Sequence, residues 1–222
     1  YRIESELGRG GMGVVYKVWQ ESLSRWVALK VLLGGSLAST VQRQRFEREA
    51  RAAALLKHPG VVPVFDVGEV DGYPFYTMEY VNGCSLDQHL KANEIGLAGK
   101  LRLFCDICDV VQYAHHRGVI HRDLKPANIL IDEQARPRIL DFGLAKFAGA
   151  EAESRPDAHL TMSGVFMGTL AYMSPEQTLG EPSEIDTRSD VYSLGMILYW
   201  MLTGQHAYPV YMPDTLTVIE NI

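Results

Sequence analysis

The chain has 222 residues and is 47% hydrophobic, so it can bury a core in one domain or in two lobes. Its net charge of −6 argues against a nucleic-acid-binding surface, which would need an excess of Lys and Arg. Three cysteines cannot form a disulfide framework and fit a reducing compartment.

The N-terminal residues predict two β-strands joined by a glycine-rich turn. Residues 1–8 and 14–19 favour strands, and the turn between them has the pattern G-x-G-x-x-G. Glycine lets backbone N–H groups approach a phosphate closely, but the pattern alone also fits an ordinary glycine-rich hairpin. In a nucleotide-dependent oxidoreductase the pattern opens a helix, whereas here a strand follows, so we disfavour that function.

The next apolar run, residues 25–33 (RWVALKVLL), predicts a buried strand that carries one lysine, Lys30. An ammonium group inside such a run needs an anionic partner. Residues 61–70 and 73–81 predict two more strands, which complete a small lobe with five strands.

A helix is predicted over residues 39–57 because four apolar side chains recur at helical spacing. These side chains are Phe46, Ala50, Ala53 and Leu56. Glu49 lies beside this apolar face, whereas Glu47 lies roughly 200° away around the helix. Glu49 is therefore the candidate partner for a buried cation, and the alternative for it is a solvated surface charge.

The rest of the chain predicts a larger, mainly helical part. Helices are expected within residues 82–91 and over 97–117 and 186–204, with Gly118 and Gly204 ending the last two. The apolar stripe predicted for the 97–117 helix consists of Leu97, Leu101, Phe104, Cys108 and Val111. Cys105 and Cys108 form a C-x-x-C that we interpret as structural, because the chain has no second cysteine pair. The apolar run over residues 191–202 is too short to span a bilayer.

Residues 119–143 (VIHRDLKPANILIDEQARPRILDFG) contain the side chains best suited to chemistry. Asp123, Asn128 and Asp141 are oxygen-bearing side chains on turns that flank short apolar runs, and Lys125 adds a cation. Such oxygens suit Mg²⁺, which usually needs one or two carboxylates together with substrate phosphates. One turn can thus supply a base, a metal ligand and a positive charge. The alternative for each residue alone is helix capping or turn formation.

Taken together, HRDLKPAN at 121–128, DFG at 141–143, the glycine-rich turn and VALK at 27–30 resemble the catalytic domain of the eukaryotic-type protein kinases. The VALK sequence departs mildly from the family's V-A-I-K. Lys125, two residues after Asp123, makes the chain resemble the Ser/Thr kinases rather than the tyrosine kinases. The GGMGVVY, HRDLKPAN and SPEQ sequences look most like bacterial members of that group.

The resemblance implies a role for each residue of the 119–143 stretch. Asp123 would accept the proton of the substrate hydroxyl, and Lys125 would steady the transferred phosphoryl group. Asn128 and Asp141 would hold Mg²⁺, with Mn²⁺ as an alternative ion.

The resemblance also implies an ATP site in the small lobe. Lys30 would hold the α- and β-phosphates and pair with Glu49, while the backbones of Glu79 and Val81 would bind the adenine edge. Met78 would gate the pocket behind the adenine, or serve only in core packing. The full set of residues assigned to the nucleotide is Leu7, Gly8, Arg9, Gly10, Gly11, Met12, Gly13, Val14, Val15, Ala28, Lys30, Glu49, Met78, Glu79 and Val81.

Residues 144–176 would carry regulation. Because Arg122 precedes the catalytic aspartate, a phosphate on this loop is expected, at Thr161 or Ser163, although both also fit ordinary loop hydroxyls. Thr169 would be a substrate-loop residue near the catalytic aspartate. Asp190, at the start of the 186–204 helix, could accept hydrogen bonds from the catalytic-loop backbone or serve as an N-cap.

The predicted fold class is α+β, a two-lobed protein kinase-like fold. Residues 1–81 would form the nucleotide-binding lobe and residues 82–222 the larger catalytic and substrate lobe. The family has about three further helices, with an Arg that pairs with Glu176, so the large lobe is expected to be incomplete. The chain begins with Tyr1 rather than Met, so its N-terminus is expected to be a cut edge, and no signal peptide is expected within it.

The predicted function is a Ser/Thr protein kinase that transfers the γ-phosphoryl group of ATP to protein hydroxyls. Its partners would be protein substrates and a second copy of the chain for autophosphorylation in trans, not nucleic acid. It would act in the cytoplasm, alone or as the cytoplasmic domain of a membrane-anchored protein. The alternative is a pseudokinase-like nucleotide-binding or scaffold module.

Overall fold

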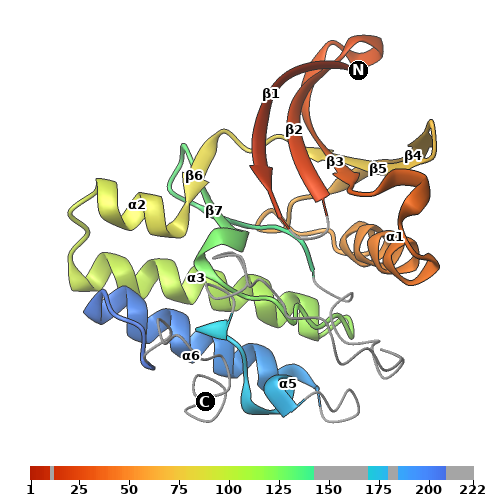
Figure 1. The fold of residues 1–222 in the computed structure, drawn as a ribbon. Coiled ribbons are helices and arrows are strands. Elements are labelled where there is room, and N and C mark those ends of the chain that lie inside the picture. The colour runs from red at the N-terminus through yellow and green to blue at the C-terminus, as the bar shows by residue number, and fades with distance from the viewer. Residues whose placement is uncertain (11–12, 143–169, 180–184, 209–222) are drawn as a thin grey trace.

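The computed structural model describes residues 1–10, 13–142, 170–179 and 185–208. Its larger sheet is antiparallel, in the order β1-β2-β3-β5-β4 (Figure 1). The strands are β1 (Arg2–Arg9), β2 (Gly13–Gln20), β3 (Arg25–Leu32), β4 (Val64–Val70) and β5 (Tyr73–Glu79). The 3-10 turns η1 (Glu21–Leu23) and η2 (Gly35–Leu37) follow β2 and β3. These strands match the predicted small sheet.

The helix α1 (Thr40–Ala54) packs beside this sheet and begins with a capping box at Ser39. Ser39 Oγ accepts from the N–H of Gln42 at 3.2 Å, and Gln42 Oε1 accepts from the N–H of Ser39 at 2.9 Å. These two bonds satisfy N–H groups that a helix start leaves unpaired. The helix buries Phe46 and Ala50 as predicted.

Two boundary predictions in this part of the chain were wrong. The helix predicted to residue 57 ends at Ala54, because the N–H groups of Leu55 and Leu56 bond to carbonyls three residues back and tighten the last turn. The strand predicted from residue 61 begins at Val64. Val61 instead forms an isolated parallel bridge with Ile139, so residues 61–63 connect to the second sheet.

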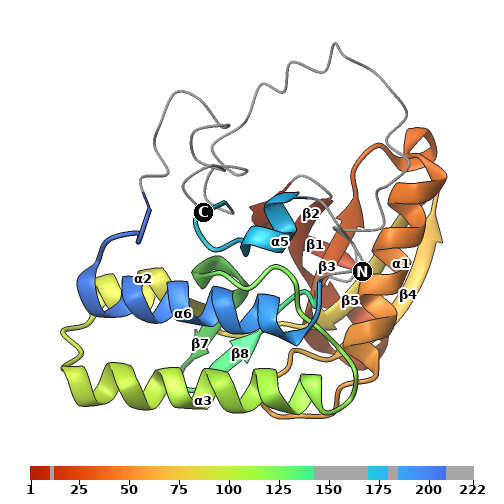
Figure 2. The ribbon, with the colours of Figure 1, turned by 90° about the horizontal axis from the view of Figure 1, so that it is seen from below.

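The remainder of the described chain is mainly helical, as predicted. A small antiparallel sheet has the order β6-β7-β8, and α3 and α6 lie side by side beneath it (Figure 2). The elements are β6 (Gly83–Ser85), α2 (Leu86–Ala92), α3 (Leu97–His115), η3 (Pro126–Asn128), β7 (Ile129–Asp132), β8 (Pro137–Ile139), α5 (Pro175–Leu179) and α6 (Thr187–Thr203). The proposed division between residues 81 and 82 falls between β5 and β6 and stays a prediction.

The stripe predicted to form the buried face of α3 was only partly right. Val111 is buried as predicted, but Leu97 is 64% exposed and Leu101 is 40% exposed. The other buried side chains of α3 are Leu103, Ile107, Val110 and Ala114. The buried row lies about 100° around the helix from the predicted one. Apolar residues occupy more than one face of α3, so spacing alone could not select the face that meets α6.

Glycines end two helices where the sequence placed them. Gly118 and Gly204 have φ of 71° and 72°, a left-handed conformation that glycine adopts without a steric penalty. The N-cap of α6 is Asp186, whose carboxylate accepts from the N–H of Arg188 at 2.8 Å, so the N-cap role considered for Asp190 belongs to Asp186. No helix in the described ranges is long and apolar enough to span a membrane.

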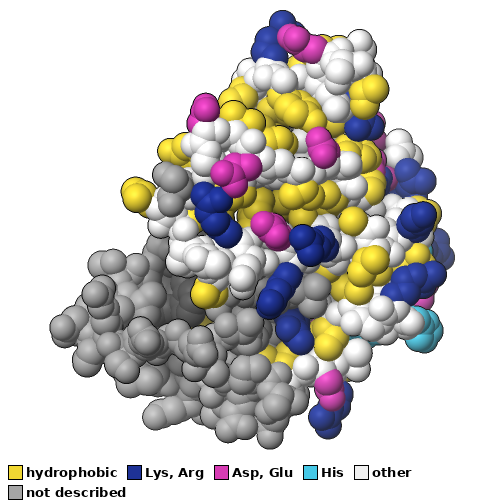
Figure 3. Space-filling view, turned by 90° about the vertical axis from the view of Figure 1, so that its right-hand side faces the viewer, with side chains coloured by type: hydrophobic (Ala, Val, Ile, Leu, Met, Phe, Trp, Pro, Cys, Tyr) yellow, Lys and Arg dark blue, Asp and Glu magenta, His cyan; other side chains and the backbone are white. Residues whose placement is uncertain are grey.

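The side of the molecule that carries α1 and the edge strand β4 is mixed in character (Figure 3). Phe65, Val67 and Val70 of β4 are 40–59% exposed. Lys, Arg, Asp and Glu side chains surround the apolar ones, so charges of both signs are interspersed on this face.

The glycine-rich turn yields a prediction about β2. A Cβ atom at Gly13 would lie 2.5 Å from the backbone oxygen of Val31 on β3, whereas a Cβ at Gly8 would meet no atom within 4 Å. We expect Gly13→Ala to destabilise the protein by about 1–3 kcal/mol, because the two paired strands must separate. Gly8→Ala is the matched control. Urea unfolding of both variants tests this, and equal midpoints for the two would contradict it.

Candidate active site

The site is built around Lys30 in the middle of β3, whose strand neighbours are β2 and β5. Lys30 pairs with Val15 on one side and with Tyr76 on the other, and directly paired residues point to the same face of a sheet. The lysine is only 8% exposed. Its ammonium group therefore needs partners inside the protein.

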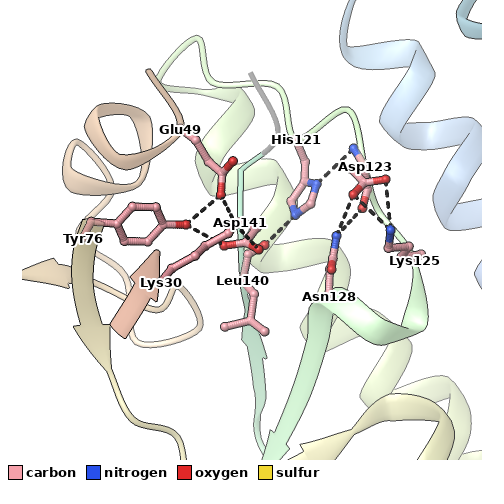
Figure 4. A network of polar contacts seen from close by, with 9 residues as sticks. All are labelled: Lys30, Glu49, Tyr76, His121, Asp123, Lys125, Asn128, Leu140 and Asp141. Atoms are coloured by element: carbon pink, nitrogen blue, oxygen red, sulfur yellow. Dashed lines mark hydrogen bonds and ion pairs between the residues drawn. The ribbon is translucent and has the colours of Figure 1, made fainter. Parts of the chain in front are cut away.

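Two carboxylates contact this ammonium group, and a phenol contacts both carboxylates (Figure 4). Lys30 Nζ donates to Glu49 Oε1 of α1, and to Oδ2 of Asp141 at 2.7 Å. The hydroxyl of Tyr76 lies 2.7 Å from Glu49 Oε1 and 3.0 Å from Asp141 Oδ1. The predicted contact between Lys30 and Glu49 is therefore present, and Asp141 joins it from the segment after β8.

The charges of this cluster follow from burial and from the neighbouring groups. Burial opposes the ammonium form of Lys30, but the carboxylates of Asp141 and Glu49 outweigh it and raise the pKa of Lys30. Burial also opposes ionisation of Asp141, yet the nearby lysine lowers the pKa of that carboxyl. Burial and the charge of Asp141 raise the pKa of Glu49 to about 7. Glu49 is thus the member of the cluster that takes up a proton most easily.

A second group of side chains lies in the loop between α3 and β7. The side-chain amide of Asn128 donates from Nδ2 to the backbone oxygen of Asp123 at 2.8 Å and to its Oδ2 at 3.1 Å. Lys125 Nζ lies 3.2 Å from the same Oδ2. The three predicted catalytic residues are therefore in mutual contact, and the donors fix the carboxylate of Asp123.

The backbone of this loop is held from below by Asp190 of α6, as the sequence suggested. Its buried carboxylate accepts from the N–H groups of His121 and Arg122, both at 2.8 Å, and contacts His115 Nε2 at 2.7 Å. Arg122 has a φ of 64°, which is rare for a non-glycine residue and costs energy. The two bonds to Asp190 stabilise this conformation.

His121 connects the loop to Asp141, a role that the sequence analysis did not assign. Burial lowers the pKa of His121, so its ring is neutral. Nδ1 accepts from the N–H of Asp123 at 3.2 Å, which leaves Nε2 to donate to the backbone oxygen of Leu140 at 2.9 Å. The residue that precedes Asp141 is thus tied to the catalytic loop, and Asp141 itself has a strained φ of 47°.

The other residues assigned to the nucleotide divide by where their side chains point. Ala28 and Met78 are paired across β3 and β5 and are buried, on the same face as Lys30 and Val15. Val14 pairs with Val31 on the opposite face, so only its backbone can reach a ligand on the Lys30 side. Arg9 bonds to Glu6 on the exposed surface at 2.8 Å.

The remaining assigned residues lie at the edges of the site. Leu7 and Gly8 belong to β1, Gly10 follows it, and Gly13 opens β2. The side chain of Glu79 binds Arg138 of β8, and its backbone N–H donates to the carbonyl of Pro63 at 3.1 Å. Val81 is buried just after β5. The predicted residues Gly11, Met12, Thr161, Ser163 and Thr169 fall outside the described ranges.

Only some of the residues predicted to take part in regulation lie in the described ranges. Arg122 Nε is buried and has no hydrogen-bond partner among them. Glu176, for which the resemblance implies an Arg partner, accepts a hydrogen bond from Ser189 Oγ at 2.5 Å. Gln177 also donates to the backbone oxygen of Arg122 at 2.9 Å, so α5 contacts the catalytic loop.

Comparisons with known proteins agree with this geometry. The sequence model of the protein kinase domain family matches residues 1–219 of this chain. The chain belongs to the protein kinase domain family. Its two-lobed fold, with an antiparallel sheet in one lobe and helices in the other, is that of a protein kinase domain.

Several bacterial proteins resemble this kinase domain. It is 36% identical to the serine/threonine-protein kinase PknD of Protochlamydia amoebophila, over 91% of this chain and 23% of that protein. It is 41% identical to the serine/threonine-protein kinase pkn3 of Myxococcus xanthus, over 92% of this chain and 38% of that protein. The PknI kinase domain of Mycobacterium tuberculosis superposes with a TM-score of 0.68 at 29% identity, covering 98% of this chain and 79% of that one. The chain thus spans well under half the length of PknD and pkn3.

The donor set of the kinase domain fits a divalent cation. Asn128 directs its NH₂ group to Asp123, so its amide oxygen is the atom that could bind a cation. Asp141 is ionised, and hard cations such as Mg²⁺ prefer carboxylate and amide oxygens. These two side chains suit Mg²⁺ together with phosphate oxygens.

Replacing Lys30 by methionine tests the charges of the cluster. Glu49 would then be buried beside the partly exposed Asp141 without their shared cation, so the pKa of Glu49, already about 7, would rise further. A carboxyl whose pKa is raised in the folded state contributes stability below its unfolded pKa and loses it as the pH rises through the folded value. We expect the urea midpoint of Lys30→Met to be lower at pH 8 than at pH 6, by more than for the wild type.

Lys91→Met is the control for this experiment. Lys91 lies 3.5 Å from Asp87 in an ion pair at the exposed surface of α2, where water solvates the carboxylate that remains. Its midpoint should follow the wild type at both pH values. A Lys30→Met protein that behaves like this control would contradict the assigned charges.

Proposed function

We propose that the chain catalyses transfer of the γ-phosphoryl group of ATP to Ser or Thr hydroxyls of proteins. The observation that carries the proposal is the contact of Lys30 with both Glu49 and Asp141, 2.7 Å from the latter. The His121 bond to Leu140 links that cluster to the loop of Asp123. A phosphate-binding cation, a metal ligand and a base thus belong to one connected network.

The nucleotide would bind on the face of the sheet that carries Lys30. A lysine has three N–H donors, and two of those of Lys30 meet Glu49 and Asp141, so the third can serve a phosphate oxygen. Ala28 and Met78 offer apolar surface for the base on the same face. The backbone of residues 79–81 would bind the adenine edge.

Asp141 and the amide oxygen of Asn128 would hold Mg²⁺, or Mn²⁺ in its place. When bound, the ion neutralises charge on the phosphates. The protein's part is to hold these two ligands in place. Asn128 does so through its bonds to Asp123, and Asp141 through its bond to Lys30.

Asp123 would orient the substrate hydroxyl and accept its proton. Its carboxylate receives hydrogen bonds from Asn128 and Lys125, which hold it in one orientation. Lys125, 3.2 Å from Asp123, is close enough to stabilise a phosphoryl group passing to that hydroxyl. Little covalent chemistry falls to the protein, because positioning and electrostatics carry most of the rate in phosphoryl transfer.

The proposal extends to the setting of the reaction. The substrates are proteins, and a second copy of the chain is one of them, with phosphate accepted at Thr161 or Ser163. The reaction takes place in the cytoplasm, in the chain alone or as part of a longer membrane-anchored protein. The buried Nε of Arg122 supports a phosphate-bearing loop near the catalytic residues.

A phosphoryl-transfer assay tests this function. Wild-type protein with radiolabelled ATP and Mg²⁺ should label itself or a generic protein substrate, and Asp141→Ala should not. Asp123→Asn should lower kcat by roughly 10²–10⁴-fold, because it removes the base, while nucleotide affinity stays within about twofold. Calorimetric titration with ADP measures that affinity.

Asp66→Asn, on the exposed edge strand β4, is the matched control and should keep wild-type turnover. Equal losses of affinity and turnover in Asp123→Asn would contradict its role as base. Nucleotide binding without any transfer in the wild type would instead favour a pseudokinase-like binding module.

A further inference from the structure

The proposed reaction does not use Tyr76, although its hydroxyl lies within the charged cluster. Tyr76 sits in the middle of β5, directly paired with Lys30, and is 1% exposed. Its ring packs against Phe46 of α1 with centroids 4.9 Å apart, a contact that any aromatic side chain could make. The hydroxyl is therefore the part of this residue that needs an explanation.

The hydroxyl bridges two carboxylates from distant segments (Figure 4). It lies 2.7 Å from Glu49 Oε1 and 3.0 Å from Asp141 Oδ1. Burial, and then the charges of Asp141 and Glu49, raise the pKa of Tyr76 well above its usual value, so the phenol keeps its proton and acts as a donor. Its one proton can be donated to only one carboxylate at a time, so it is shared between two acidic groups that also share the single charge of Lys30.

The contacts of Asp141 show what this donor adds. Oδ2 of Asp141 binds Lys30 at 2.7 Å, whereas Oδ1 faces the Tyr76 hydroxyl. A carboxylate with a different partner on each oxygen cannot rotate about its Cβ–Cγ bond without losing one of them. Among the described residues, loss of the hydroxyl would leave Lys30 as the side chain that donates to Asp141 and to Glu49.

We propose that the Tyr76 hydroxyl is a positioning group that fixes the Asp141 carboxylate and the inward side of α1, so that the metal ligand is oriented before nucleotide and metal arrive. This inference rests on the proposed function, in which Asp141 is a metal ligand. Groups that hydrogen-bond to a metal ligand typically change metal affinity by 10–100-fold when removed. We expect the affinity for the metal to fall and the affinity for the nucleotide to stay, because the proposed ATP-binding surface of Ala28, Lys30 and Met78 keeps its side chains.

The test is Tyr76→Phe, which keeps the ring and removes only the hydroxyl. Calorimetric titration with ADP over a range of Mg²⁺ concentrations should show an apparent Mg²⁺ requirement about 10-fold higher than in the wild type. At saturating Mg²⁺ the ADP affinity should lie within about twofold of the wild type. In kinetic assays kcat at limiting Mg²⁺ should fall, while KM for ATP at saturating Mg²⁺ stays nearly unchanged.

Tyr113→Phe is the matched control. The Tyr113 hydroxyl accepts from the backbone N–H of Lys57 at 3.1 Å and donates to the backbone oxygen of the same residue at 2.5 Å. Its loss should lower stability without changing the Mg²⁺ requirement. A Tyr76→Phe protein that loses stability but keeps the wild-type Mg²⁺ requirement would overturn the inference, because its hydroxyl would then be merely structural.

Two further measurements separate the possible failures. Incorporation of p-aminophenylalanine at position 76 restores a hydrogen-bond donor and should return the Mg²⁺ requirement towards the wild-type value. A raised Mg²⁺ requirement in this variant would contradict the hydrogen-bond account, and this test holds even if Tyr76→Phe fails to fold. In protein without nucleotide or metal, Tyr76→Phe should speed amide hydrogen exchange in α1. A wild type that transfers no phosphate would overturn the proposed function, whereas an active wild type with an unchanged Tyr76→Phe overturns this inference alone.

Discussion

The structure depends on one buried ammonium group shared by two carboxylates from distant parts of the chain. Lys30 lies on the central strand of the sheet, Glu49 comes from α1, and Asp141 follows β8. Burying any one of these charges alone would be costly, and removing one partner of a buried ion pair leaves the remaining charges unpaired. The cluster therefore holds helix, sheet and the segment of Asp141 in a single arrangement, and the same arrangement presents a cation and the proposed metal ligand together.

The helical lobe holds its half of the site through backbone contacts. Asp190 of α6 accepts hydrogen bonds from two consecutive N–H groups of the catalytic loop, and neutral His121 reaches from that loop to Leu140. Both residues are fully buried, so neither contact competes with water. The positive φ values at Arg122 and Asp141 lie at the two ends of this connection. Strain of this kind persists only where the surroundings determine the backbone, and here they do.

Much of this arrangement could be predicted from the sequence, because the chemistry is written in short motifs with fixed spacing. The strands around Lys30, the choice of Glu49 over Glu47, and the contact of Asp190 with the loop all follow from local pattern and the family resemblance. The buried face of α3 did not, because apolar residues on several of its faces leave the choice to α6. Residues 61–63 were predicted to begin the strand β4, but Val61 pairs with Ile139 instead. A partner distant in the sequence outweighed the local preference for a strand. Tyr76 could have been found by counting two residues back from Met78 along the strand, which places it on the face of Lys30.

The most direct test of the central claim is a double-mutant cycle on the phosphoryl-transfer rate, with Lys30→Met and Glu49→Gln alone and combined. Residues that act as one unit are strongly non-additive. The account predicts that the double variant is hardly slower than Lys30→Met alone, because the first substitution already removes what Glu49 supports. Losses that simply multiply would mean that the two residues act independently, and would contradict the account.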